Sequence, residues 1–147
     1  MTGPAFADSK RTHRFPIRVY FEDTDAGGVA YHANYLKWAE RARTESLRDM
    51  GLPHSLMMER YNAMLVVRRI EVEYVAPARL DEALLVATRV KGFGAASLDL
   101  SQDVLRAEGE AVLARMAIGL VCVRPDGLRP TRLPPPWRTA LAGLAPV

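Results

Sequence analysis

The sequence predicts an α+β domain in which one long helix packs on an antiparallel sheet of about five strands. Three observations predict this class: a single long segment with helical periodicity, several segments with strand periodicity, and short turns between them. The chain has 147 residues, of which 49% are hydrophobic and 25% are charged. It therefore fits a single domain over residues 1–147, with a folded core expected at about residues 15–134.

The first strand is predicted over residues 14–21, RFPIRVYF. Phe15, Ile17, Val19 and Phe21 alternate with polar positions and are expected to face the core, and Pro16 favours an edge strand.

The periodicity becomes helical from about residue 34 to residue 50, and Gly51 and Pro53 mark the end of this helix. One broad face is formed by Tyr35, Leu36, Ala39, Ala42, Ser46, Leu47 and Met50. At about 1.5 Å per residue the helix is roughly 25 Å long, enough to cross a small domain.

A short helix is compatible with residues 53–62, and four strands are expected after it, around 66–74, 84–91, 96–106 and 111–123. Turns are predicted at AEGE (107–110) and RPDG (124–127), and GFGAA (92–96) is typical of a hairpin turn. The tail RPTRLPPPW (129–137) is too rich in proline to continue a strand.

The segment 111–123 is apolar on both of its faces. An antiparallel sheet in a monomer usually leaves one face in water. This pattern therefore predicts that a second subunit covers part of the sheet.

Composition narrows the function classes. Cys122 is the only cysteine, so no internal disulfide can form, and no apolar run is long enough to cross a bilayer or to serve as a signal peptide. The formal net charge is +3, without a run of Lys or Arg that would mark a nucleic-acid surface. We expect a cytoplasmic protein with no transmembrane segment and no nucleic-acid partner.

The segment EDTDAGGVAYHANY (22–35) combines charge, glycine and histidine at the entrance of the long helix. Asp23 and Asp25 share a side of an extended chain, and Gly27 and Gly28 let a ligand approach the backbone closely. The first N–H groups of a helix lack internal partners. A carboxylate beside such donors can attack a carbonyl, or activate water, while the donors stabilise an oxyanion.

A thioester suits so sparse a site, because its thiolate leaving group, with a pKa near the ~8.5 of cysteine, departs without strong acid assistance. Three other interpretations of the segment remain open. It could be only a loop with an Asx turn; Asp23, Asp25 and His32 could bind a divalent metal; or His32 could simply orient the turn. No second cluster with ligand spacing accompanies the segment, so neither a metal nor a cofactor is predicted.

The stretch YFEDTDAGGVAYHANYLKWAERARTESLRDMGL resembles the signature region of the 4-hydroxybenzoyl-CoA thioesterase family of hotdog-fold enzymes, in particular its tol-pal system-associated acyl-CoA thioesterases. The segments VEYVAPARLDEALLVATRV and AIGLVCV are similar to that family as well. The resemblance implies a hotdog fold, in which a sheet wraps the helix, and dimers with a continuous sheet, often joined into tetramers.

The resemblance also implies roles for individual residues. Asp25 matches the catalytic carboxylate, and His32 matches a histidine beside it whose backbone N–H stands where relatives place the oxyanion donor. Asp23 carries no catalytic assignment, and Phe21 stands where relatives can have a tyrosine. Further substrate-binding residues are expected at motif positions and where coenzyme A phosphates would lie: Gly28, Tyr31, Asn34, Arg68 and Lys91.

The function expected from these observations is hydrolysis of acyl-CoA thioesters to a free acid and coenzyme A, with acyl carrier protein as another possible acyl donor. Two alternatives are a hotdog enoyl-thioester hydratase and a non-catalytic module, linked to the cell envelope, that binds acyl thioesters or acyl carrier protein. Release of free thiol distinguishes the three, because only hydrolysis yields it.

Overall fold

The structure is a computed structural model that describes residues 11–146. Within this range the sheet has five strands, β1 (His13–Arg18), β2 (Met64–Tyr74), β3 (Ala83–Phe93), β4 (Ser97–Arg106) and β5 (Val112–Val123). The helices are η2 (Phe21–Asp23, a 3-10 turn), α2 (His32–Asp49), α3 (His54–Tyr61) and α4 (Pro135–Ala142). The predicted long helix, the short helix and all five predicted strands are present.

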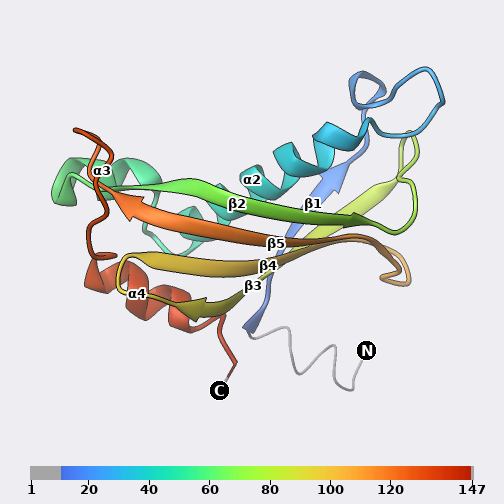
Figure 1. Ribbon diagram of the computed structural model, residues 1–147. Helices are drawn as coiled ribbons and strands as arrows, with labels where there is room; N and C mark the ends of the chain where they lie inside the picture. The colour runs from blue at the N-terminus through green and yellow to red at the C-terminus, as the bar shows by residue number, and fades with distance from the viewer. Residues whose placement is uncertain (1–10, 147) are drawn as a thin grey trace.

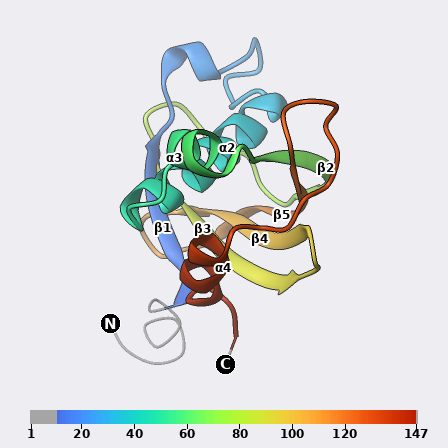
Figure 2. The same cartoon turned by 90° about the vertical axis from the view of Figure 1, so that its left-hand side faces the viewer.

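Every strand pairs antiparallel to its neighbours, in the order β1-β3-β4-β5-β2, so β1 and β2 form the two edges. Figures 1 and 2 show α2 and α3 against one face of the sheet, while α4 lies at the end where β3 turns into β4. The chain between β1 and α2 lies at the opposite end, which we call the loop end.

The central helix begins and ends for clear local reasons. Its inward face buries Tyr35, Trp38, Ala39, Ala42, Ser46 and Leu47. At its C-terminus Gly51 adopts φ +75°, and the N–H groups of Gly51 and Leu52 donate to the carbonyls of Arg48 and Leu47, both at 2.9 Å. This is a Schellman cap, for which glycine is the favoured residue. The helix starts at His32, two residues earlier than the periodicity indicated.

The first strand is shorter than predicted. Val19 is fully buried as expected, but the chain then leaves the sheet, and Phe21 is 81% exposed in η2. The carboxylate of Asp23 accepts the N–H of Tyr20 at 2.8 Å, and this hydrogen bond turns the chain. The prediction that Phe21 faces the core was therefore wrong.

The proline-rich tail does not continue a strand, as predicted, but it starts α4, which was not anticipated. Pro135 and Pro136 occupy the first helical positions, where a missing N–H costs no hydrogen bond. Trp137 is buried and donates from Nε1 to the carbonyl of Leu52 at 2.9 Å. α4 thereby fastens the end of the sheet to the helical layer.

The outer face of β5 is only partly apolar in the folded chain. Leu113 and Val123 are already buried by the chain itself, whereas Arg115 and Ala117 between them are exposed. The N–H groups of Val75 and Ala76 donate to the carbonyl of Leu113, at 2.8 and 3.1 Å. The apolar residues on this face therefore do not by themselves require a second subunit.

Candidate active site

The motif residues form a small hairpin at the loop end. Thr24 pairs with Ala30, and the N–H of Asp25 donates to the carbonyl of Val29 at 3.0 Å. Residues 26–28 connect Asp25 to Val29, and the last of the three, Gly28, has φ +81°. A left-handed residue at this point is characteristic of three-residue hairpin loops, and it explains why glycine stands there.

Asp25 carries an exposed carboxylate that is held on one side only. Its Oδ1 accepts the N–H of Gly27 at 2.8 Å, an Asx turn. Among residues 11–146, no hydrogen bond engages its other oxygen, Oδ2. The Asx turn anticipated as an alternative is therefore present, and it orients the carboxylate while leaving one oxygen available.

Asp23 has a different role. Oδ2 of its carboxylate accepts the N–H of Tyr20, and its carbonyl accepts the N–H of Tyr31 at 2.8 Å and Nδ2 of Asn34 at 2.7 Å. Asp23 and Asn34 thus fasten the hairpin to the first turn of α2. The carboxylates of Asp23 and Asp25 accept hydrogen bonds from different turns. Within the described residues, no three His, Cys, Asp or Glu side chains gather in a way that could hold a metal ion.

The start of α2 offers unoccupied hydrogen-bond donors. Tyr31 is the N-cap and gives the helix no side-chain hydrogen bond. In the described part of the chain, the backbone N–H of His32 has no acceptor. The positive end of the helix dipole is therefore open to a developing negative charge.

His32 is exposed and lies between two tyrosine rings. Its ring centroid is 4.4 Å from that of Tyr31 and 6.2 Å from that of Tyr74, and the Tyr74 hydroxyl donates to the His32 carbonyl at 2.8 Å. Burial and the neighbouring Tyr35 raise the pKa of Tyr74, so its phenol stays protonated as a donor. Sequence analysis did not identify Tyr74 as a site residue, because only the folding of β2 beside α2 brings it to His32.

A groove of about 290 Å³ opens beside His32, and its walls include Ala30, Tyr35, Tyr74 and Val75. It is mostly apolar and therefore suits an apolar chain. Asp25 is not among its lining residues. In a single chain, the carboxylate and the groove are neighbours at the loop end rather than parts of one enclosed pocket.

The segment after β2 supports this groove. The N–H of Ala30 donates to the Ala78 carbonyl, and the N–H of Ala78 donates to the buried Tyr35 hydroxyl, both at 2.9 Å. Glu82 accepts the N–H of Arg79 at 2.6 Å and Nε of Arg106 at 2.8 Å. Burial acts to raise the pKa of Glu82, but these donors outweigh it and leave the pKa below its usual value.

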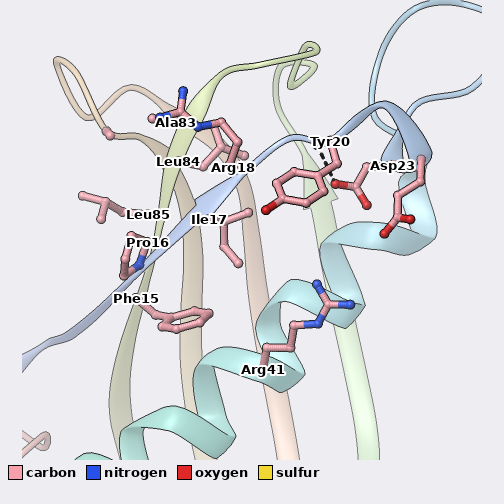
Figure 3. A pocket seen from close by; sticks show the side chains of 12 residues that line it. Phe15, Pro16, Ile17, Arg18, Tyr20, Asp23, Arg41, Ala83, Leu84 and Leu85 are labelled. Carbon is pink, nitrogen blue, oxygen red and sulfur yellow. Dashed lines mark hydrogen bonds between the residues drawn. The ribbon is translucent and has the colours of Figure 1, made fainter.

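A second, larger groove of about 510 Å³ lies between β1, η2 and α2 (Figure 3). Phe15 and Ile17 project into it from β1, Arg41 projects from α2, and Asp23 and Tyr20 close one end. Neither Asp25 nor His32 lines this groove. Although this groove is larger than the one beside His32, it is therefore not the candidate catalytic site.

The two residues expected at the phosphates lie away from the hairpin. Arg68 is exposed at a register shift of β2, on the unpaired edge of the sheet. Lys91 is exposed near the end of β3, ~26 Å along the strand from Ala83 at the loop end. Within one chain the structure does not bring Arg68 or Lys91 to the groove beside His32.

Comparison with known proteins gives matches over most of the chain. The profile of the thioesterase-like superfamily matches residues 19–141. An acyl-CoA thioester hydrolase YbgC from Escherichia coli is 46% identical over 122 residues, covering 82% of this chain and 89% of the relative. An acyl-CoA thioesterase YbgC from Haemophilus influenzae is 38% identical over 120 residues, covering 82% and 87%.

Two solved structures extend the likeness to the fold. A 1,4-dihydroxy-2-naphthoyl-CoA thioesterase from Synechocystis superposes with a TM-score of 0.83 at 26% identity, covering 89% of this chain and 96% of that one. A probable thioesterase from Bartonella henselae gives a TM-score of 0.78 at 34% identity, covering 84% and 99%. None of the described helices is long and apolar enough to cross a membrane.

Proposed function

The chain belongs to the thioesterase-like superfamily, and from this premise we propose that it hydrolyses acyl-CoA thioesters to a free acid and coenzyme A. The hotdog fold that the sequence predicted is the fold observed. Curated relatives that are acyl-CoA thioesterases support the enzyme class over most of the chain.

The observation that carries the mechanism is the exposed carboxylate of Asp25, oriented by an Asx turn, at the same end of the fold as the uncapped start of α2. Oδ2 of Asp25 acts as nucleophile or as general base for water, and Oδ1 stays bonded to Gly27. The backbone N–H of His32 donates to the thioester oxygen as it becomes negative. The carbon–sulfur bond then breaks, coenzyme A leaves as a thiolate, and water supplies the second oxygen of the acid.

The neighbouring motif residues position the substrate. Gly28 leaves room for the pantetheine chain because it has no side chain, and Tyr31 packs on the ring of His32. Asn34 ties the helix start to Asp23. Tyr74 holds the carbonyl of His32, and so keeps the proposed oxyanion donor in place.

The active assembly is a dimer that pairs β2 with β2 of a second copy. This edge is unpaired in the single chain, and Val67, Tyr74 and Val75 on or next to it are 45–48% exposed. Such an edge is a template for strand pairing. A partner placed there covers the groove beside His32 and brings its own Arg68, on the paired edge, closer to the coenzyme A phosphates. Lys91 lies on β3, which β4 and β5 separate from that edge.

The experiment that tests this function is thiol release from a series of acyl-CoAs, followed with a thiol-reactive dye. A thioesterase releases stoichiometric thiol and acid. An enoyl-thioester hydratase consumes enoyl-CoA without releasing thiol, and a binding module does neither. Absence of thiol release from every acyl-CoA and from the matching acyl carrier proteins would contradict the proposal.

A further inference from the structure

A cavity of about 120 Å³ lies between α2 and the sheet, toward the end that α4 closes. Its walls are mostly apolar and include Leu65, Leu98, Leu100, Leu120 and Leu141. Two lining residues are exposed, Glu40 on α2 and Val67 on β2. The mouth of the cavity therefore opens between the helix and the edge strand.

A buried polar network stands at the wall of this cavity. Gln102 is fully buried, and its Nε2 donates to the Ala39 carbonyl and to the Thr88 hydroxyl, both at 3.0 Å. Its Oε1 accepts a hydrogen bond from Nη1 of Arg43 at 2.9 Å. The amide of Gln102 is thus well satisfied, and it fixes the guanidinium of Arg43 in place.

Arg43 has more donors than the described residues use. A guanidinium carries five N–H donors, and the bond to Gln102 is the only hydrogen bond that Arg43's side chain makes among residues 11–146. Its nitrogens are absent from the buried unsatisfied atoms of that range, so the remaining donors reach the cavity or solvent. Burial lowers the pKa of Arg43, and Glu40 acts against this shift.

His54 adds a second polar group to the lining. Burial is the main cause that lowers the pKa of His54, with Arg43 and Arg48 lowering it further and Glu40 opposing them. The ring is therefore neutral at pH 7, and Arg43 is the cationic donor of the cavity. An apolar chamber with a fixed cationic donor inside, and the carboxylate of Glu40 at its exposed mouth, fits an apolar chain that ends in an acceptor oxygen.

The volume limits the size of this ligand. A dry cavity of about 150 Å³ accommodates benzene, so this cavity holds a group of about five carbon-sized atoms.

A short acyl group held at the catalytic end of the same chain does not reach this cavity. Arg43 lies eleven positions along α2 from His32, about 16 Å at the helical rise, which is longer than a five-carbon acyl group. The edge strand β2 runs from Leu65 at the cavity to Tyr74 at the catalytic groove. When two copies pair antiparallel along β2, the cavity end of one meets the catalytic end of the other.

Resting on the proposed thioesterase function, we infer that this cavity receives the far end of the acyl group held by the partner. Arg43 there selects acyl groups whose last atom is an acceptor oxygen, a hydroxyl or a carboxylate. The leucine walls hold the methylene carbons between that oxygen and the thioester. Arg43 is a specificity residue in this arrangement, and it takes no part in breaking the thioester.

The test compares three acyl-CoAs of equal length: pentanoyl-CoA, 5-hydroxypentanoyl-CoA and glutaryl-CoA. The wild-type protein should hydrolyse at least one of the two oxygenated substrates with a kcat/KM about tenfold or more above that for pentanoyl-CoA. Preference for both identifies an oxygen acceptor, and preference for glutaryl-CoA alone identifies a carboxylate. A kcat/KM for pentanoyl-CoA equal to or above those for both oxygenated substrates would overturn the inference.

Variants assign the preference to Arg43. Arg43→Met should abolish the preference mainly through KM, and Arg43→Lys should keep part of it because the charge remains. The matched control is Arg60→Met, which removes an exposed arginine of α3 outside the cavity and should keep the wild-type ratio. A preference that survives in a folded Arg43→Met protein would refute the role of Arg43.

A binding measurement distinguishes failure of this inference from failure of the proposed function. Calorimetry of Asp25→Asn should show tighter binding of the preferred oxygenated acyl-CoA than of pentanoyl-CoA, without any turnover. If no acyl-CoA releases thiol, the proposed function fails, and calorimetry of the wild-type protein still decides whether the cavity discriminates. If Arg43→Met does not fold, Leu100→Phe, which fills the cavity, should weaken binding of all three ligands; unchanged binding would overturn the inference.

Discussion

At the scale of residues, the two aspartates of one short motif have different hydrogen-bond partners. Each carboxylate accepts one backbone N–H group. Asp23 is half-buried and its carbonyl also accepts hydrogen bonds from Tyr31 and Asn34, whereas Asp25 is exposed. The difference follows from position: Asp23 lies where η2 meets α2, and Asp25 begins the hairpin loop.

The first prediction ranks these residues by turnover. Asp25→Asn should lower kcat by ~10²–10⁴-fold, because the amide can neither attack nor remove a proton. His32→Ala should cost about 10–100-fold, since the backbone N–H survives the substitution. Asp23→Asn should be the mildest, because an amide oxygen still accepts the N–H of Tyr20. Steady-state hydrolysis by folded variants measures the order, and a dead Asp23→Asn beside an active Asp25→Asn would reverse the assignment.

The second prediction concerns His54 and pH. Because burial lowers the pKa of His54 in the folded state, the unfolded chain binds a proton first as the pH falls. The stability that neutral His54 supports is therefore full above the unfolded pKa of about 6.5 and is lost as the pH falls toward the folded pKa. Urea unfolding from pH 8 to pH 5 should show this loss, and His54→Phe should reduce its slope. An unchanged slope in that variant would exclude His54 as the cause.

Sequence reasoning at this scale can propose site residues but not the side chains that fold against them. Asp25, Gly28 and His32 could be proposed because their spacing is a local property of the chain. Tyr74 could not, because it reaches His32 only after β2 lies beside α2. Phe21 was placed in the core because strand alternation cannot foresee the turn that Asp23 makes.

At the scale of elements, the edge strand β2 links the two inferences about function. One end carries the cavity residues Leu65 and Val67, and the other end carries Tyr74 beside His32. Its register shift between Val67 and Arg69 leaves Arg68 at the middle of the edge. β-Bulges of this kind redirect a side chain and often accompany functional sites.

The third prediction tests this edge. Val67→Lys places a charge on the exposed edge, which opposes strand pairing. Light scattering should give a dimer or a larger species for the wild-type protein and a mass near 16 kDa for this variant, with thioesterase activity lost as well. Leu128→Lys is the matched control, because Leu128 is 57% exposed in the turn after β5 and should leave the assembly intact. A monomeric wild-type protein with full activity would contradict the paired edge.

Element boundaries were predictable where the chain carries its own signal. Gly51 marked the end of α2 because a Schellman cap is made from neighbouring residues. The start at His32 was less clear, because the helix begins without a side-chain cap. α4 was overlooked because three prolines in a row disfavour a strand but are tolerated at a helix start.

At the scale of the whole molecule, the groove beside His32 and the basic residues expected at the phosphates lie far apart in one chain. The family resemblance placed the nucleotide near the segment after Lys91, and Lys91 and Arg68 were the basic residues proposed for its phosphates, but the sequence could not indicate which subunit's substrate they would meet. That depends on contacts between copies. The two apolar faces of β5 were also an incomplete guide to subunit association, because the chain itself buries part of the outer face.

The fourth prediction concerns recognition of the nucleotide. If Arg68 and Lys91 of the assembly bind the coenzyme A phosphates, an acyl-CoA should have a higher kcat/KM than the matching acyl-pantetheine, chiefly through a lower KM. Moderate salt should narrow the difference, because it screens exposed charges. Lys91→Ala and Arg68→Ala should each also narrow the difference in kcat/KM between the two substrates. Lys37→Ala on α2 is a charge-matched control that should leave this difference unchanged. Equal efficiencies for both substrates at low salt would show that the phosphates are not recognised.

The strand order β1-β3-β4-β5-β2 also constrains how the chain can be made. β3, β4 and β5 form a local meander, but β1 and β2, which are synthesised first, have no sheet partner until β3 and β5 follow them. During translation, the apolar faces of β1, α2 and β2 therefore emerge from the ribosome before the surface that buries them exists. The nascent chain must wait for its second half before it can fold, and in that interval it is exposed to chaperones and to aggregation.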